Sequence, residues 1–203
     1  MVSEPYNGRI VRNFRNFFIS LNYDLFEISN NMKNVDGYSS FNEFEYYVMA
    51  LEDRRFLEHG GYDLKSLFRE AGKCLMLKKH GGASTIDMQM VRTLTNFRDL
   101  TLYRKIYEII LSVLINYKFS KKQIVRCYLS NAFFGSGLYG FETTAIKFFG
   151  KEFSELNMDE QAFLAAMLLR PKPLKPTKKW TDLVHARASY AQKMRVFVKD
   201  GDD

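Results

Sequence analysis

The hydrophobic positions of this 203-residue chain recur mainly at the spacing of helices. In several stretches apolar residues return every three or four positions, which places them on one helix face. These stretches cover residues 9–21, 64–79, 102–117, 121–129, 141–149, 159–169 and 181–198. No stretch of useful length alternates apolar and polar residues as a half-buried strand does. The pattern therefore predicts a mainly α fold.

One more helix is predicted from about residue 41, with Ser40 as its cap and Glu43 at the capping-box position. It runs into the stretch EDRRFLEHGGYD, which begins at Glu52. Placed on a helix, Glu52, Phe56 and His59 would share one face. An acid, an aromatic ring and an imidazole on one face indicate chemistry, whereas a solvated acidic helix end with a capping glycine is the alternative.

The first 40 residues are expected to form a separate N-terminal segment, followed by one domain over residues 41–203. Between residues 9 and 21 the apolar positions are interrupted by Arg9, Arg12 and Arg15. A basic amphipathic helix of this kind can lie on an anionic membrane surface. A domain helix with a solvated face has the same pattern, so both interpretations stay open.

Composition limits the partners without choosing among them. The net charge is +7, which favours an anionic partner such as nucleic acid, acidic lipid or a phosphorylated substrate. Nucleic acid is disfavoured because the basic residues are dispersed and match no binding motif. The two cysteines have no CxxC spacing, and the three histidines form no metal-ligand pattern. No signal peptide or membrane-spanning segment is recognised in the sequence.

Five stretches together resemble the motif series of the family 51 glycosyltransferases, the peptidoglycan transglycosylases. The first is the stretch that begins at Glu52, which matches the family pattern EDxxFxxHxGxD at every fixed position. The others follow in the family's order: GGASTIDMQMVRT (81–93), RKIYE (104–108), the stretch 121–151, and LNMDEQAFLAAMLLRPKP (156–173). A single motif is only suggestive, but five in order with sensible spacing are specific.

The resemblance implies a lysozyme-like helical domain with a small membrane-facing lobe. It implies polymerisation of lipid II into a growing glycan strand, with release of undecaprenyl pyrophosphate. It also implies work at the extracytoplasmic face of a bacterial cell membrane, in contact with the membrane surface. Because the chain has no transpeptidase motifs, a separate transpeptidase is an expected partner.

The same resemblance assigns residues. Glu52 matches the general base, which suits a sugar hydroxyl that must lose its proton as it attacks. Glu108 matches the second acid, expected to order the pyrophosphate site and to be a candidate ligand of a divalent cation, Mg²⁺ or Mn²⁺, that is not essential. Cations must meet the departing pyrophosphate, and Arg92, Arg104 and Lys105 match those positions. The remaining matches are substrate-binding positions: Asp53, Phe56, His59, Ser84, Thr85 and Gln89.

Departures from the family bear on activity. Met88 stands where the second motif usually has a glutamine, Arg92 replaces a lysine, and Asn116 stands where the third motif usually ends in an acid. Leu100 and Ser130 depart as well. These changes leave two alternatives open: a scaffold protein that binds lipid II or glycan without turnover, and a lysozyme-like hydrolase. Arg104 and Glu108 could also be only a surface ion pair four residues apart.

Overall fold

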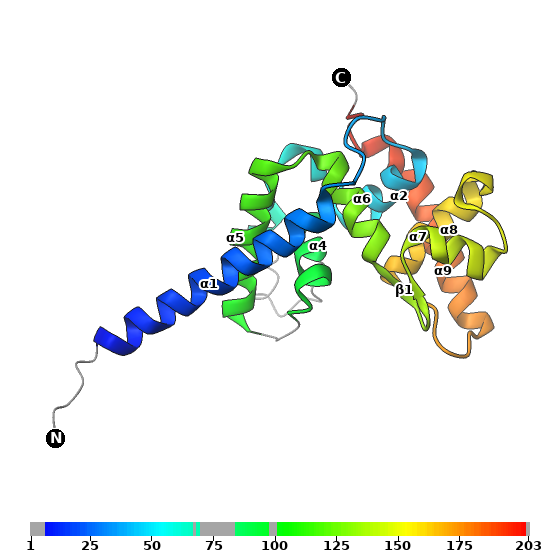
Figure 1. Ribbon diagram of the computed structural model, residues 1–203. Coiled ribbons are helices and arrows are strands. Elements are labelled where there is room, and N and C mark those ends of the chain that lie inside the picture. The colour runs from blue at the N-terminus through cyan, green and yellow to red at the C-terminus, as the bar shows by residue number, and fades with distance from the viewer. Residues whose placement is uncertain (1–6, 67, 70–83, 98–100, 202–203) are drawn as a thin grey trace.

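The computed structural model describes residues 7–66, 68–69, 84–97 and 101–201, with residues 7–14 described as backbone alone (Figure 1). It confirms the mainly α fold class. The helices are α1 (Asn7–Met32), α2 (Glu43–Glu52), α4 (Ile86–Thr95), α5 (Leu102–Lys118), α6 (Lys121–Asn131), α7 (Phe141–Thr144), α8 (Met158–Leu169) and α9 (Lys178–Met194). Short helical turns are η1 (Phe56–Glu58), η2 (Ala145–Phe149), η3 (Phe153–Glu155) and η4 (Arg195–Phe197). The strands β1 (Phe133–Gly135) and β2 (Leu138–Tyr139) pair antiparallel in a small hairpin that the pattern did not predict.

The helices form two groups that share one hydrophobic core. In one group α8 packs against both α2 and α9, and in the other α4 packs against both α5 and α6 (Figure 1). Helix α8 is apolar nearly all round, and its residues 162–167 are buried, as expected for a helix enclosed by its neighbours. The end of α2 meets the start of α4 between the two groups, since Asp53, directly after α2, accepts a hydrogen bond from the backbone N–H of Ile86.

Two local predictions around α2 were wrong. Asn42, not Ser40, caps α2, and Glu45, not Glu43, completes the capping box. The predicted shared face of residues 52, 56 and 59 also does not form, because α2 ends at Glu52. The chain then turns through η1 and is extended at His59. The predicted helix over residues 64–79 lies mostly outside the described residues.

Gly61 fixes where this turn meets the rest of the fold. Its φ is +101°, and a Cβ on it would lie 2.7 Å from the backbone carbonyl of Ser112 on α5. An L-residue is disfavoured by both the conformation and the contact. The carbonyl oxygen of Gly61 accepts a 2.8 Å hydrogen bond from Oγ1 of Thr85, which also caps α4. The glycine turn therefore joins α5 to the start of α4.

Helix α1 is longer than the predicted 9–21 and has two different halves. Its C-terminal half packs on the core through Leu21, Ile28 and Met32. Its N-terminal half points away from the body of the molecule (Figure 1). Among the described helices, none combines the length and the apolar character needed to cross a membrane.

Candidate active site

Glu52 lies at the C-terminus of α2 and is held from α4. Its Oε2 accepts a 2.6 Å hydrogen bond from Nε2 of Gln89, and Oε1 of Gln89 accepts a 2.8 Å bond from the hydroxyl of Tyr128. Burial raises the pKa of the Glu52 carboxyl above its usual range, while the bond from Gln89 and the charge of Arg187 oppose the rise. A carboxylate with a raised pKa and a fixed orientation is suited to accept a proton.

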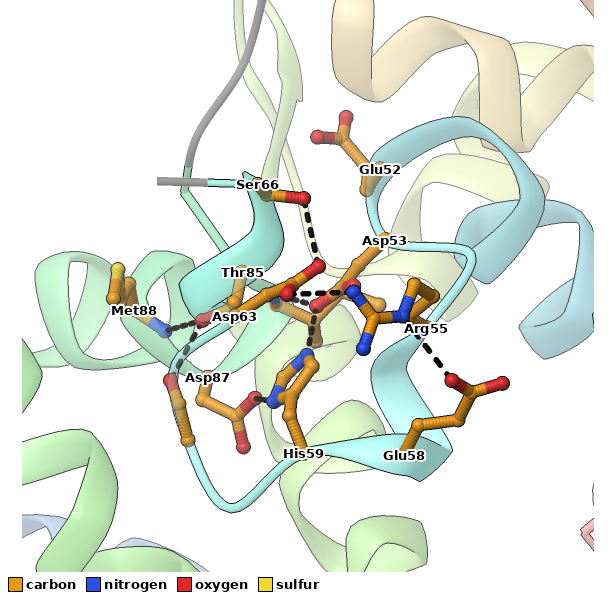
Figure 2. Close-up of polar contacts among 12 residues, drawn as sticks. Glu52, Asp53, Arg55, Glu58, His59, Asp63, Ser66, Thr85, Asp87 and Met88 are labelled. Atoms are coloured by element: carbon orange, nitrogen blue, oxygen red, sulfur yellow. Dashed lines mark hydrogen bonds and ion pairs between the residues drawn. The ribbon is translucent and has the colours of Figure 1, made fainter. Parts of the chain in front are cut away.

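The Glu52 carboxylate faces an open, polar cleft of about 370 Å³. Its lining comes from the end of α2, the turn after it and the start of α4, and includes Asp53, Arg55, Asp63, Ser84 and Thr85. Arg55 donates a 2.8 Å bond to Asp63, which also accepts from Ser66 (Figure 2). The cleft therefore offers an acid and several hydrogen-bonding groups to a polar ligand such as a sugar.

Next to the cleft, the side chains of Asp53, His59 and Asp87 form a largely buried row (Figure 2). Nε2 of His59 lies 2.9 Å from Oδ2 of Asp53, and its Nδ1 lies 3.8 Å from Oδ2 of Asp87. The ammonium of Lys121 lies 3.1 and 3.2 Å from the two oxygens of Asp87. A lysine thus already supplies the cation that two carboxylates need, so this row does not fit a metal site.

A second centre surrounds Glu108 on α5, which is buried. Nε and Nη2 of Arg92 lie 2.8 and 3.1 Å from its two oxygens, and Nη1 of Arg104 lies 2.7 Å from Oε1. Nζ of Lys105 is 3.9 Å from Oε2 and donates a 3.0 Å bond to Oγ of Ser84. Burial lowers the pKa of Lys105, and the two arginines act in the same direction.

This centre has more positive than negative charge. Three cationic side chains share one carboxylate, and Nε of Arg104 is buried without a hydrogen-bond partner in the described part of the chain. Both oxygens of Glu108 accept from guanidinium groups, so its donor set does not fit a metal ion. The excess charge instead suits an anion with several oxygens, because arginine forks onto phosphate oxygens.

The two centres meet through α4. Gln89, which binds Glu52, and Arg92, which binds Glu108, are three residues apart on that helix and so lie on one side of it. Ser84 lines the cleft and also contacts Lys105. Ser84 therefore links the lining of the cleft, which includes Glu52, to the cationic centre.

Nine of the eleven predicted site residues fall into two sets, and Phe56 and His59 lie outside both. Glu52, Asp53, Ser84 and Thr85 line the cleft. Gln89, Arg92, Arg104, Lys105 and Glu108 lie behind it in the contacts described above. Phe56 is fully buried under the ammonium of Lys121, 4.3 Å from its ring centroid, so it belongs to the core of the turn.

Sequence reasoning assigned no role to Asp87, Lys121 or Tyr128. All three fall inside motif stretches, but a contact that a carboxylate, an ammonium or a phenol makes with another helix leaves no periodic signal in the sequence. Asn116, noted as a departure, donates to Asp87. Met88 is buried with its sulfur 3.2 Å from Nζ of Lys105. Leu100 lies outside the described residues.

Known proteins similar to this chain include transglycosylases and penicillin-binding proteins. A profile of the transglycosylase family matches residues 25–195. The chain is 38% identical over 146 residues to penicillin-binding protein 1A of Rickettsia typhi, covering 70% of this chain and 18% of that protein. It is 33% identical over 171 residues to penicillin-binding protein 2a of Streptococcus pneumoniae, covering 84% of this chain and 21% of that protein. The chain thus spans about a fifth of the length of these curated relatives.

Proposed function

Because the chain belongs to the transglycosylase family, glycosyltransferase family 51, we propose that it is a peptidoglycan glycosyltransferase. In this proposal it polymerises lipid II into glycan strands and releases undecaprenyl pyrophosphate. The observation that carries the proposal is that α4 contacts two centres at once. Its Gln89 binds the carboxylate of Glu52, which has a raised pKa and lines a polar cleft, and its Arg92 belongs to the cluster of cations around the buried Glu108.

Glu52 is the proposed general base. The 4-hydroxyl of the acceptor GlcNAc attacks the anomeric carbon of the donor MurNAc, and its proton passes to the carboxylate of Glu52. The new bond joins the hydroxyl oxygen to that carbon as the bond from the carbon to the pyrophosphate oxygen breaks. The bond from Gln89 holds the carboxylate in one orientation, so little reorganisation is needed as the proton moves.

The leaving pyrophosphate is the proposed ligand of the cationic centre. Negative charge develops on its oxygens as the bond to the sugar breaks, and pre-oriented cations stabilise that charge. Arg92, Arg104 and Lys105 are held in place by Glu108 and Ser84 before any ligand binds. Glu108 is therefore a positioning residue in this proposal, and no step passes through a metal ion.

The wider setting is also a proposal. The partners would be lipid II, the growing strand, the membrane surface and a separate transpeptidase, at the extracytoplasmic face of a bacterial cell membrane. Exposed apolar residues support the membrane contact, since Phe18, Ile19, Tyr23 and Phe26 lie along α1, and Leu102, Tyr103 and Ile106 along α5. Such surfaces are typical of proteins that bind at a bilayer interface.

The test is incubation of the purified chain with labelled lipid II in detergent, beside Glu52→Gln. Glu142→Gln makes the same change at an exposed position and serves as the matched control. We expect a ladder of glycan chains from the native chain and Glu142→Gln, and none from Glu52→Gln. Saturable lipid II binding without a ladder would favour a scaffold, and new reducing ends from finished glycan would favour a hydrolase.

A further inference from the structure

The carboxylate of Asp87 is fully buried. Polar side chains from three separate parts of the chain surround it. Lys121 at the start of α6 lies 3.1 and 3.2 Å from its two oxygens, and Asn116 on α5 donates to Oδ1. His59 approaches from the turn after η1, with Nδ1 3.8 Å from Oδ2. A buried charge held by three elements fixes their relative positions, because losing any partner leaves another polar group without one.

His59 connects Asp87 to the end of α2. Its Nε2 lies 2.9 Å from Oδ2 of Asp53, the residue directly after Glu52 (Figure 2). The same oxygen of Asp53 accepts a 3.2 Å bond from the backbone N–H of Ile86, the first residue of α4. Nδ1 of His59 has no hydrogen-bond partner in the described part of the chain, so Asp87 is the group that faces it.

Asn116 stands where the family's third motif usually ends in an acid, and in this chain its contact is made to an acid on α4. We propose that Asp87 on α4 takes the place of the acid that Asn116 replaces on α5, and that its buried carboxylate makes Asp87 a positioning residue for Glu52. The inference rests on the proposed function of Glu52 as the base. Asp87 sets the start of α4, and Gln89 two residues later holds the Glu52 carboxylate.

The pair offers a sharp experiment because Asp and Asn have nearly the same shape. Asp87→Asn removes the carboxylate, Asn116→Asp adds a second one, and the double variant exchanges the two. We expect Asp87→Asn to lower kcat about tenfold or more, since small misplacements of a catalytic group are costly. The double variant should restore kcat to within about threefold of the native value, because changes at two residues in contact can compensate each other.

Asp182→Asn with Asn34→Asp makes the same two changes at exposed positions and should leave kcat unchanged. Additive losses in the exchanged variant, or full activity in Asp87→Asn, would overturn the proposal. Thermal unfolding of each variant separates a loss of positioning from a loss of fold. Rescue by exchange would not be expected if Asp87 merely filled space.

A second readout does not need activity. NMR titration of the Glu52 side-chain carboxyl reports its contact with Gln89 directly. Removing the negative charge of Asp87 would by itself lower the pKa of Glu52, whereas loosening the bond from Gln89 would raise it. We expect the midpoint to rise in Asp87→Asn and to return in the exchange, and an unchanged or lower midpoint would refute the positioning role. If the native chain makes no polymer, the proposed function fails while this titration still tests the role of Asp87.

Discussion

Nε2 of Gln89 donates a 2.6 Å hydrogen bond to Oε2 of Glu52, and this bond opposes the effect of burial on the carboxyl pKa. Gln89→Leu removes it, so the pKa of Glu52 should rise further. A base works only when deprotonated, and activity is lost as the pH falls through its pKa. The acidic limb of the pH–rate profile should therefore move to higher pH in Gln89→Leu.

The measurement is kcat/KM for polymerisation across pH. Tyr128→Phe removes only the bond from the phenol to Gln89, so its acidic limb should move less than that of Gln89→Leu. An acidic limb that stays fixed in Gln89→Leu would contradict the role of this bond.

Gly61 and Gly60 provide a matched pair for stability. A Cβ on Gly61 would lie 2.7 Å from the carbonyl of Ser112 at a φ of +101°, whereas a Cβ on Gly60 meets nothing within 4 Å. Gly61→Ala should lower the free energy of unfolding by about 2 kcal/mol or more, since both strain and overlap must be relieved. Gly60→Ala should change it by less than about 1 kcal/mol. Urea denaturation measures both, and equal effects would show that the turn tolerates a side chain.

The spacing of apolar residues predicted the helices well, because a helix buried on one face carries apolar residues every three or four positions. The helix over residues 102–117 was confirmed almost residue for residue as α5. The predicted face shared by Glu52, Phe56 and His59 does not form, because α2 ends at Glu52. The next residue, Asp53, instead accepts a hydrogen bond from the backbone N–H of Ile86 and contacts His59.

The candidate site divides in the same way. Its principal residues were identified through a resemblance to a known motif series, and their roles stay predictions. The supports at Asp87, Lys121 and Tyr128 were missed, because each depends on a contact between different helices. Nothing in the spacing of Asp87 and Asn116 along the chain indicates that they touch.

Replacing Arg92 by lysine should keep the positive charge beside Glu108 but lose the two-pronged contact of the guanidinium. Its Nε and Nη2 bind the two oxygens of Glu108, and a lysine ammonium can keep only part of this contact. Arg92→Lys should lower the free energy of unfolding by about 1–2 kcal/mol and keep polymerisation within about tenfold. Arg170→Lys, at an exposed position, is the control for both measurements. A loss of activity as large as that of Glu52→Gln would mean that the planar guanidinium, and not only its charge, is required at the pyrophosphate.

Removing divalent cations should leave polymerisation largely intact. The oxygens of Glu108 are occupied by guanidinium groups, and Lys121 supplies the cation beside Asp87. Rates measured with EDTA and with added Mg²⁺ or Mn²⁺ should agree within about twofold, because fixed side-chain charges meet the leaving group. A large EDTA effect that Mg²⁺ or Mn²⁺ reverses would require a metal ion bound with the substrate.

The exposed stripe of α1 should carry part of the membrane contact. Phe18 and Phe26 are eight residues apart on α1, so they lie on the same side of that helix, and both are more than half exposed. Burying such side chains in a bilayer interface is favourable, and nearby basic residues add attraction to anionic lipid. The double variant Phe18→Ser with Phe26→Ser should lower partitioning onto anionic vesicles by about tenfold or more. Leu174→Ser, at a still more exposed apolar position in the loop between α8 and α9, should bind as the native chain does. Equal loss in both variants would mean that general surface hydrophobicity, not the α1 stripe, sets the binding.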